Sequence, residues 1–135
     1  MNYFLAKTEP STYSIDDLER DRRTTWDGVT NAQAVRTIRE MQPGDRVFIY
    51  HSGGVSSIVG FADVKSKARD DAKNPKSAVV DLEFAGRLEP VTLAEIKSSK
   101  KFDDWALVRQ GRLSTMAVPE KFVAWMRERF PKVKL

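Results

Sequence analysis

The chain has 135 residues, of which 41% are hydrophobic and 31% charged, a composition typical of one globular domain and not of a disordered chain. Lys and Arg number 23 against 19 Asp and Glu, so the formal net charge is +4, a modest excess that favours an anionic partner without specifying one. There is no cysteine, which excludes disulfides and thiol chemistry, and no apolar stretch approaches membrane-spanning length. We therefore expect a cytoplasmic protein with no signal peptide and no membrane partner.

The first segments predict a short strand followed by a short helix. Residues 3–6 are typical of a strand, and Ser14 and Asp17 form the pattern Ser-x-x-Asp, in which each side chain satisfies a free N–H of the first helical turn. A solvated turn follows this helix. Its adjacent arginines, Arg22 and Arg23, are candidates to contact phosphates.

The next segment predicts a turn that leads into a helix. Asp27-Gly28 is a turn dipeptide, because Gly accepts a positive φ and Asp can bond nearby backbone. Thr30 and Gln33 fit a capping box, and apolar residues repeat at helical spacing as far as Met41.

Trp26 and Asn31 flank this turn and are the main candidates for a ligand site. They place an aromatic plane and an amide near a helix N-terminus, which suits a flat polar ligand. The alternative is that Trp26 is a core residue and Asn31 only caps the helix, and pattern alone favours that alternative.

The rest of the chain alternates strands with short helices. Strands are expected over residues 46–51, 57–65, 78–88 and 113–118, an exposed connection over 65–76, and helices over 92–97, 102–107 and from Pro119 onward. The small residues Gly60 and Ala62 indicate a close approach or a strongly curved strand. Strands without regular βαβ alternation indicate a single α+β domain over residues 1–135, with an antiparallel or mixed sheet. Pattern alone does not decide whether this sheet closes.

The motif Trp-Asp-Gly-Val-x-Asn-x-Gln-Ala at residues 26–34 resembles the signature of the EVE domain family, a branch of the PUA-like superfamily. Two positions depart from the family pattern, namely Thr30, where Arg is common, and Ala32, where Tyr is common. Further matching motifs follow in order at residues 4–10, 41–45, 50–52, 58–60, 80–82, 107–110 and 112–114. The resemblance implies a PUA-like sheet curled into a small β-barrel of roughly five or six strands, with short helices packed at its side. It also implies a reader of modified bases.

An unstacked base presents a π-face and a polar edge, so its reader needs an aromatic plane and a few fixed donors and acceptors. We expect Trp26 to stack on a flipped or single-stranded base in DNA or RNA, modified cytosine being favoured, while Asn31 and Ser52 address its edge. The resemblance places His51 and Gln110 at the same pocket. For each of these residues a structural role stays open, such as a turn hydrogen bond for Ser52. The sequence predicts a monomer that needs no cofactor and no metal.

Basic residues are expected to meet the phosphates of the nucleic acid. The candidates are Lys7, Arg22, Arg23, Arg109 and Arg112. Lys7 is equally typical of a solvated cation at a strand end, and one of the two arginines beside Gly111 suits a structural ion pair.

Catalysis is less well supported by the sequence. His51 is the only histidine, so it cannot supply a usual metal cluster, and its neighbour Ser52 points to the opposite face of the strand. An enzyme acting on nucleotides or nucleic acid with His51 as base is nevertheless one alternative function. A small-metabolite or protein-interaction module is another.

Overall fold

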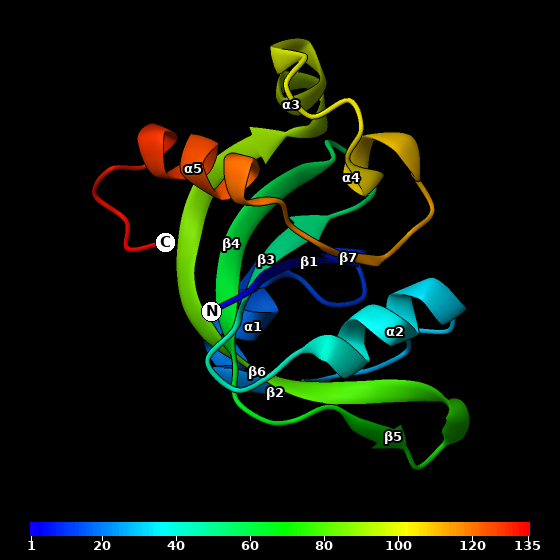
Figure 1. The fold of residues 1–135 in the computed structure, drawn as a ribbon. Helices are drawn as coiled ribbons and strands as arrows, with labels where there is room; N and C mark the ends of the chain where they lie inside the picture. Colours follow the sequence, from blue (N-terminus) through cyan, green and yellow to red (C-terminus); the bar gives the residue numbers. More distant parts are fainter.

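The computed structural model describes residues 1–135, in which seven strands form one curved sheet bordered by five helices (Figure 1). The strands are β1 (Tyr3–Thr8), β2 (Arg23–Trp26), β3 (Arg46–His51), β4 (Ser57–Val64), β5 (Arg69–Asp71), β6 (Asn74–Thr92) and β7 (Thr115–Ala117). Their order is β2-β6-β4-β3-β1-β7, with β5 paired to β6. Strands β1 and β3 run parallel and the other pairs antiparallel, so the predicted α+β fold with a mixed sheet is confirmed.

The sheet curls without closing into a continuous hydrogen-bonded barrel. No pairing joins its two end strands, β2 and β7. Helix α2 (Ala32–Glu40) contacts both β6 and β7 and thereby covers the opening between the two ends of the sheet (Figure 1).

Strands β4 and β6 pair irregularly around Gly60, where the sequence predicted a close approach or a strongly curved strand. The register between the two strands shifts on either side of this residue. A Cβ on Gly60 would lie 2.6 Å from Cδ1 of Ile15 and 2.7 Å from the carbonyl oxygen of Gly86, so only glycine allows this close approach. The space is used by α1 (Ile15–Asp21), which packs against β6.

Local capping signals placed two helix starts correctly. The capping boxes Ser14/Asp17 and Thr92/Glu95 open α1 and α3 (Leu93–Ser99) as predicted. The capping box predicted at Thr30 is wrong. The N-cap of α2 is Asn31, whose Oδ1 accepts from the N–H groups of Gln33 at 2.9 Å and Ala34 at 3.1 Å.

Three other boundaries differ from the sequence-based expectations. Strand β6 extends well beyond the predicted 78–88, because β2, β4 and β5 all pair with it. The connection over 65–76 contains β5, and the helix predicted over 102–107 is instead α4 (Ala106–Arg109). Trp105 precedes that helix and packs against Phe122 of α5 (Glu120–Arg129), with their ring centroids 4.6 Å apart.

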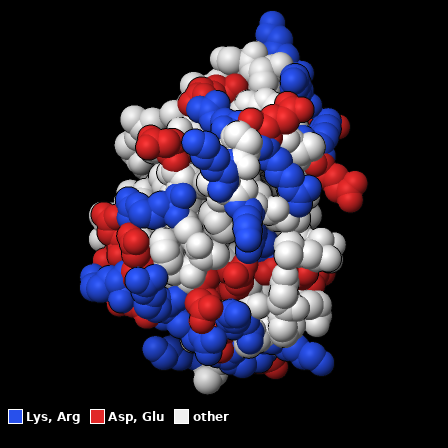
Figure 2. Space-filling model, turned by 90° about the vertical axis from the view of Figure 1, so that its left-hand side faces the viewer, with Lys and Arg blue, Asp and Glu red and all other residues white.

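Charged side chains on one side of the molecule are mixed in sign. Figure 2 shows Lys and Arg interleaved with Asp and Glu on the side that carries the C-terminus. Many charges of the protein are paired, for example Arg46 with Asp63 at 2.9 Å and Arg129 with Glu95 at 2.7 Å. This side therefore carries no extended positive field for a polyanion.

Candidate functional site

A pocket of about 460 Å³ lies where the ends of β1 and β2 meet the loop that leads into α2. Its lining includes Lys7, Tyr13, Trp26, Asp27, Asn31 and Arg112. This size is ordinary for a small-molecule site and exceeds what a single nucleobase needs. The structure therefore brings together four of the predicted site residues, Lys7, Trp26, Asn31 and Arg112, from three separate parts of the sequence.

Trp26 forms the aromatic wall of the pocket. It is 8% exposed, so most of the indole packs into the core while the remainder lines the pocket. Tyr13 meets it edge to face, with ring centroids 6.3 Å apart and an interplanar angle of 85°. The Trp105 indole N–H donates to the carbonyl oxygen of Ala117 at 2.9 Å, whereas the Trp26 indole N–H has no acceptor within the protein. Since this nitrogen is not among the buried polar atoms that lack a partner, it is accessible from outside and available to a ligand.

Asn31 is held rigidly by its capping role. Its Oδ1 accepts two backbone N–H bonds, so the group that remains available in the pocket is the amide NH₂, which can only donate. Gly28 has a φ of 78° in the loop before it, the left-handed turn that the Asp27-Gly28 dipeptide predicted. This turn places the Asp27 carboxylate at the pocket.

Two cations line the pocket without a carboxylate partner. The Lys7 ammonium donates to the carbonyl oxygen of Gly111 at 3.1 Å and lies 5.4 Å from the centroid of the Tyr50 ring. Burial lowers its pKa below the ordinary value. Arg112 is exposed and forms no ion pair. Both charges are therefore free to meet an anionic group.

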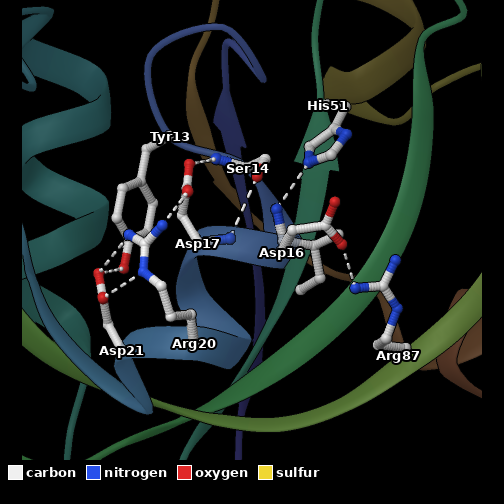
Figure 3. A network of polar contacts seen from close by, with 9 residues as sticks. Tyr13, Ser14, Asp16, Asp17, Arg20, Asp21, His51 and Arg87 are labelled. Atoms are coloured by element: carbon white, nitrogen blue, oxygen red, sulfur yellow. Dashed lines mark hydrogen bonds and ion pairs between the residues drawn. The ribbon is translucent and has the colours of Figure 1, made fainter.

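His51 lies on another side of helix α1, in a second hollow that also contains Arg87 and Phe130. Its Nε2 accepts from the backbone N–H of Ile15 at 3.0 Å, at the start of α1 (Figure 3). Burial lowers the pKa of His51; Asp16 opposes this shift and Arg87 reinforces it. The imidazole thus anchors the helix in its neutral form and does not line the Trp26 pocket.

The other predicted residues also lie outside the pocket lining. The Ser52 hydroxyl donates to Oε1 of Glu9 at 3.3 Å, and Gln110 is an exposed residue that ends α4. Arg109 is exposed on α4. Their contacts with a base or a phosphate stay predictions, made only if a bound nucleic acid extends beyond the pocket.

The arginines at the start of β2 already have partners within the protein. The Arg22 guanidinium lies 5.7 Å from the centroid of the Phe84 ring, and Arg23 pairs with Glu83 at 3.2 Å. Both side chains are exposed, so a phosphate contact from either stays a prediction.

Sequence reasoning missed Tyr13 and Asp27 as pocket residues. Asp27 directly follows Trp26, so its place in the turn was the signal that could have indicated it. Nothing local predicts Tyr13, because its contact with Trp26 depends on how α1 docks. No group of three or more His, Cys, Asp or Glu side chains is arranged to hold a metal ion, and none of the helices is both long and apolar enough to cross a bilayer.

Comparison with known proteins adds family information to this geometry. The family model described as EVE domain matches residues 2–129. Thymocyte nuclear protein 1 of Rattus norvegicus is 31% identical over 126 residues, covering 72% of this chain and 56% of that protein. The Homo sapiens protein of the same name is 30% identical over the same shares. The chain thus spans about half the length of these relatives.

Solved structures agree with this match. The NMR structure of Rpa0253 from Rhodopseudomonas palustris is 31% identical, has a TM-score of 0.90, and covers 100% of this chain and 97% of its own. The crystal structure of human THYN1 protein in complex with 5-methylcytosine-containing DNA has a TM-score of 0.87 at 24% identity, and covers 99% of this chain and 100% of its own. These likenesses confirm the PUA-like fold expected from the sequence.

Proposed function

Because the chain belongs to the EVE domain family, we propose that it binds a nucleobase that is flipped out of a duplex or lies in a single strand of DNA or RNA. The favoured base is a modified cytosine. In this proposal the base is bound and not chemically changed, and the protein acts as a cytoplasmic monomer without a cofactor.

The observation that carries the proposal is that the Trp26 indole lines a pocket together with two cations that have no carboxylate partner. Base–aromatic stacking contributes about 1–3 kcal/mol per base in nucleic-acid-binding proteins. The Asn31 amide donates to the base edge, and Lys7 and Arg112 meet the phosphates on either side of the extruded base. The THYN1 structure in complex with 5-methylcytosine-containing DNA, which shares this fold, supports a nucleic acid as the ligand.

The effect of a modification is expected to be modest. A methyl group that becomes fully buried contributes about 0.8 kcal/mol, which corresponds to about fourfold in affinity. A preference of this size for modified over unmodified cytosine is what apolar burial alone predicts.

Titration of short single-stranded oligonucleotides tests the proposal. The strands carry 5-methylcytosine, cytosine or an abasic site at one position, and binding is followed by fluorescence anisotropy at two salt concentrations. We expect 5-methylcytosine to bind about fourfold tighter than cytosine, and the abasic strand to bind most weakly because it has no ring to stack. Equal, salt-dependent affinity for all three strands would reduce the interaction to nonspecific attraction and refute the proposal. Sedimentation velocity of the free and bound protein checks the monomeric state.

A further inference from the structure

Several of the hydrogen-bonding side chains that line the pocket are already bonded within the protein. The Thr8 hydroxyl donates to the carbonyl oxygen of Tyr13 at 2.7 Å, the Tyr13 hydroxyl to Asp21 at 2.9 Å, and the Thr25 hydroxyl to Asp81 at 2.9 Å. The Asn31 oxygen is committed to the helix cap. These commitments reduce the set of groups that can read a base edge.

Asp27 is the charged acceptor of the pocket. It is the one carboxylate in the pocket lining, it is exposed, and it takes part in no ion pair or hydrogen bond. It does not cap α2, since Asn31 has that role. All of its acceptor capacity is therefore available, beside an amide that can only donate.

We propose that this pocket selects a base with an exocyclic amino group next to an unprotonated ring nitrogen, with Asp27 as the residue that determines specificity. The proposal rests on the function proposed above. The Asp27 carboxylate accepts from the amino N–H, and the Asn31 amide donates to the ring nitrogen. Cytosine and adenine, with or without a methyl group that leaves one amino hydrogen, present this donor–acceptor pair.

Thymine and uracil present the reverse pair and are rejected by the same two residues. Their O4 oxygen faces the Asp27 carboxylate, acceptor against acceptor, and their N3–H faces the Asn31 amide, donor against donor. A polar site discriminates strongly when the wrong ligand leaves its groups unpaired. The negative charge of Asp27 is tolerated beside a polyanion because Lys7 and Arg112 line the same pocket without carboxylate partners.

The contribution of the base edge to affinity can be measured by comparing two bases of nearly the same shape. 5-Methylcytosine and thymine share their ring and their methyl group, and they differ at position 4 and in the proton on N3. We measure the affinity of the protein for two otherwise identical single strands that carry one or the other. The expected result is a preference for 5-methylcytosine of about tenfold or more, the range given by one well-formed pair of edge contacts.

The variant Asp27→Asn assigns the preference to this residue. An amide can accept from N4–H or, after a flip, donate to O4, so we expect the ratio of the two affinities to fall towards one. Asp103→Asn is the matched control, because Asp103 is an exposed carboxylate outside the pocket that forms no ion pair. It changes the net charge equally and should leave the ratio unchanged. Thermal unfolding verifies that both variants are folded.

The outcomes separate this inference from the proposed function. If the wild-type protein binds both strands equally and both more tightly than an abasic strand, base stacking holds and selection of the amino group is refuted. A preference that survives Asp27→Asn assigns the selection to another residue and also refutes the inference. If neither strand binds more tightly than the abasic one, the proposed function itself fails.

Discussion

Replacing Trp26 is the most direct perturbation of the proposed pocket, and leucine is the informative replacement. The indole is 8% exposed, so Trp26→Ala would remove a large core side chain at a cost of about 3–5 kcal/mol. That loss is comparable with the whole unfolding free energy of a small domain. Leucine keeps part of the apolar volume in the core and removes the flat π-face from the pocket.

The affinity loss can be separated from the stability loss by magnitude. Loss of stacking, about 1–3 kcal/mol, corresponds to a five- to 150-fold weaker complex with a base-containing strand. A variant that retains even about 3 kcal/mol of unfolding free energy is more than about 99% folded, which changes the apparent affinity by about one per cent. A loss of fivefold or more therefore reports on the pocket and not on unfolding.

The assay is anisotropy titration with the 5-methylcytosine strand, beside thermal melts of each variant. Trp105→Leu is the control, because Trp105 is similarly buried, at 6% exposed, but packs against Phe102 and Phe122 and does not line the pocket. We expect Trp26→Phe to bind nearly as well as wild type, Trp105→Leu to melt at lower temperature with unchanged affinity, and Trp26→Leu to lose affinity. Equal losses for the two leucine variants, or none for Trp26→Leu, would refute stacking on this indole.

Three further predictions concern charge, pH and packing. Lys7→Met and Arg112→Met should each reduce the slope of log affinity against log salt concentration by about one, or somewhat less on a single strand. The slope is measured by titration at several salt concentrations, and an unchanged slope would exclude a phosphate contact from the replaced residue. Because burial lowers the pKa of His51 below 6.5, the unfolded chain takes up its proton first, so stability is full above about pH 6.5 and falls as pH drops through the folded pKa. Melts between pH 8 and 5 should show this loss in wild type and not in His51→Gln, and parallel curves would contradict it. Gly60→Ala, whose Cβ would lie 2.7 Å from a backbone oxygen, should lose about 1–3 kcal/mol in denaturant unfolding, whereas Gly111→Ala meets no atom within 4 Å and should not.

Local signals in the sequence predicted most of the fold, because the interactions they describe are themselves local. A capping box spans four residues, so Ser14 with Asp17 marks a helix start without reference to the rest of the chain. The start of α2 was misplaced by one residue because Thr30 and Asn31 are both good caps, and only backbone geometry decides which oxygen receives the N–H bonds. The length of β6 was underestimated because it is fixed by three pairings: with β2 and β4, which lie far from it in the sequence, and with the short strand β5, which was expected to be part of an exposed connection.

The candidate site was predictable in its sequence-adjacent part. Trp26 and Asn31 are separated by one turn, so their proximity followed from the Asp27-Gly28 dipeptide. Tyr13 and Arg112 reach the same pocket only through the packing of α1 and the end of the β1–β7 pair, which no periodicity encodes. The sequence also does not tell which polar atoms of the pocket already have hydrogen-bond partners within the protein. Asn31 was expected to address the base edge, but its oxygen is used by the helix it caps, so only its NH₂ group is left to do so.

The position of His51 bears on the choice between a binding module and an enzyme. Its Nε2 accepts the first N–H of α1, and Tyr13, which packs on Trp26, stands directly before the Ser14 cap of that helix (Figure 3). A base that takes a proton on Nε2 would break the bond that holds the start of α1, the helix that directly follows the pocket residue Tyr13 and its cap Ser14. Glutamine has an oxygen that can accept the same N–H but cannot act as a base near neutral pH. His51→Gln should therefore preserve base binding at pH 8, whereas an enzyme that uses His51 as its base would lose turnover in the same folded variant.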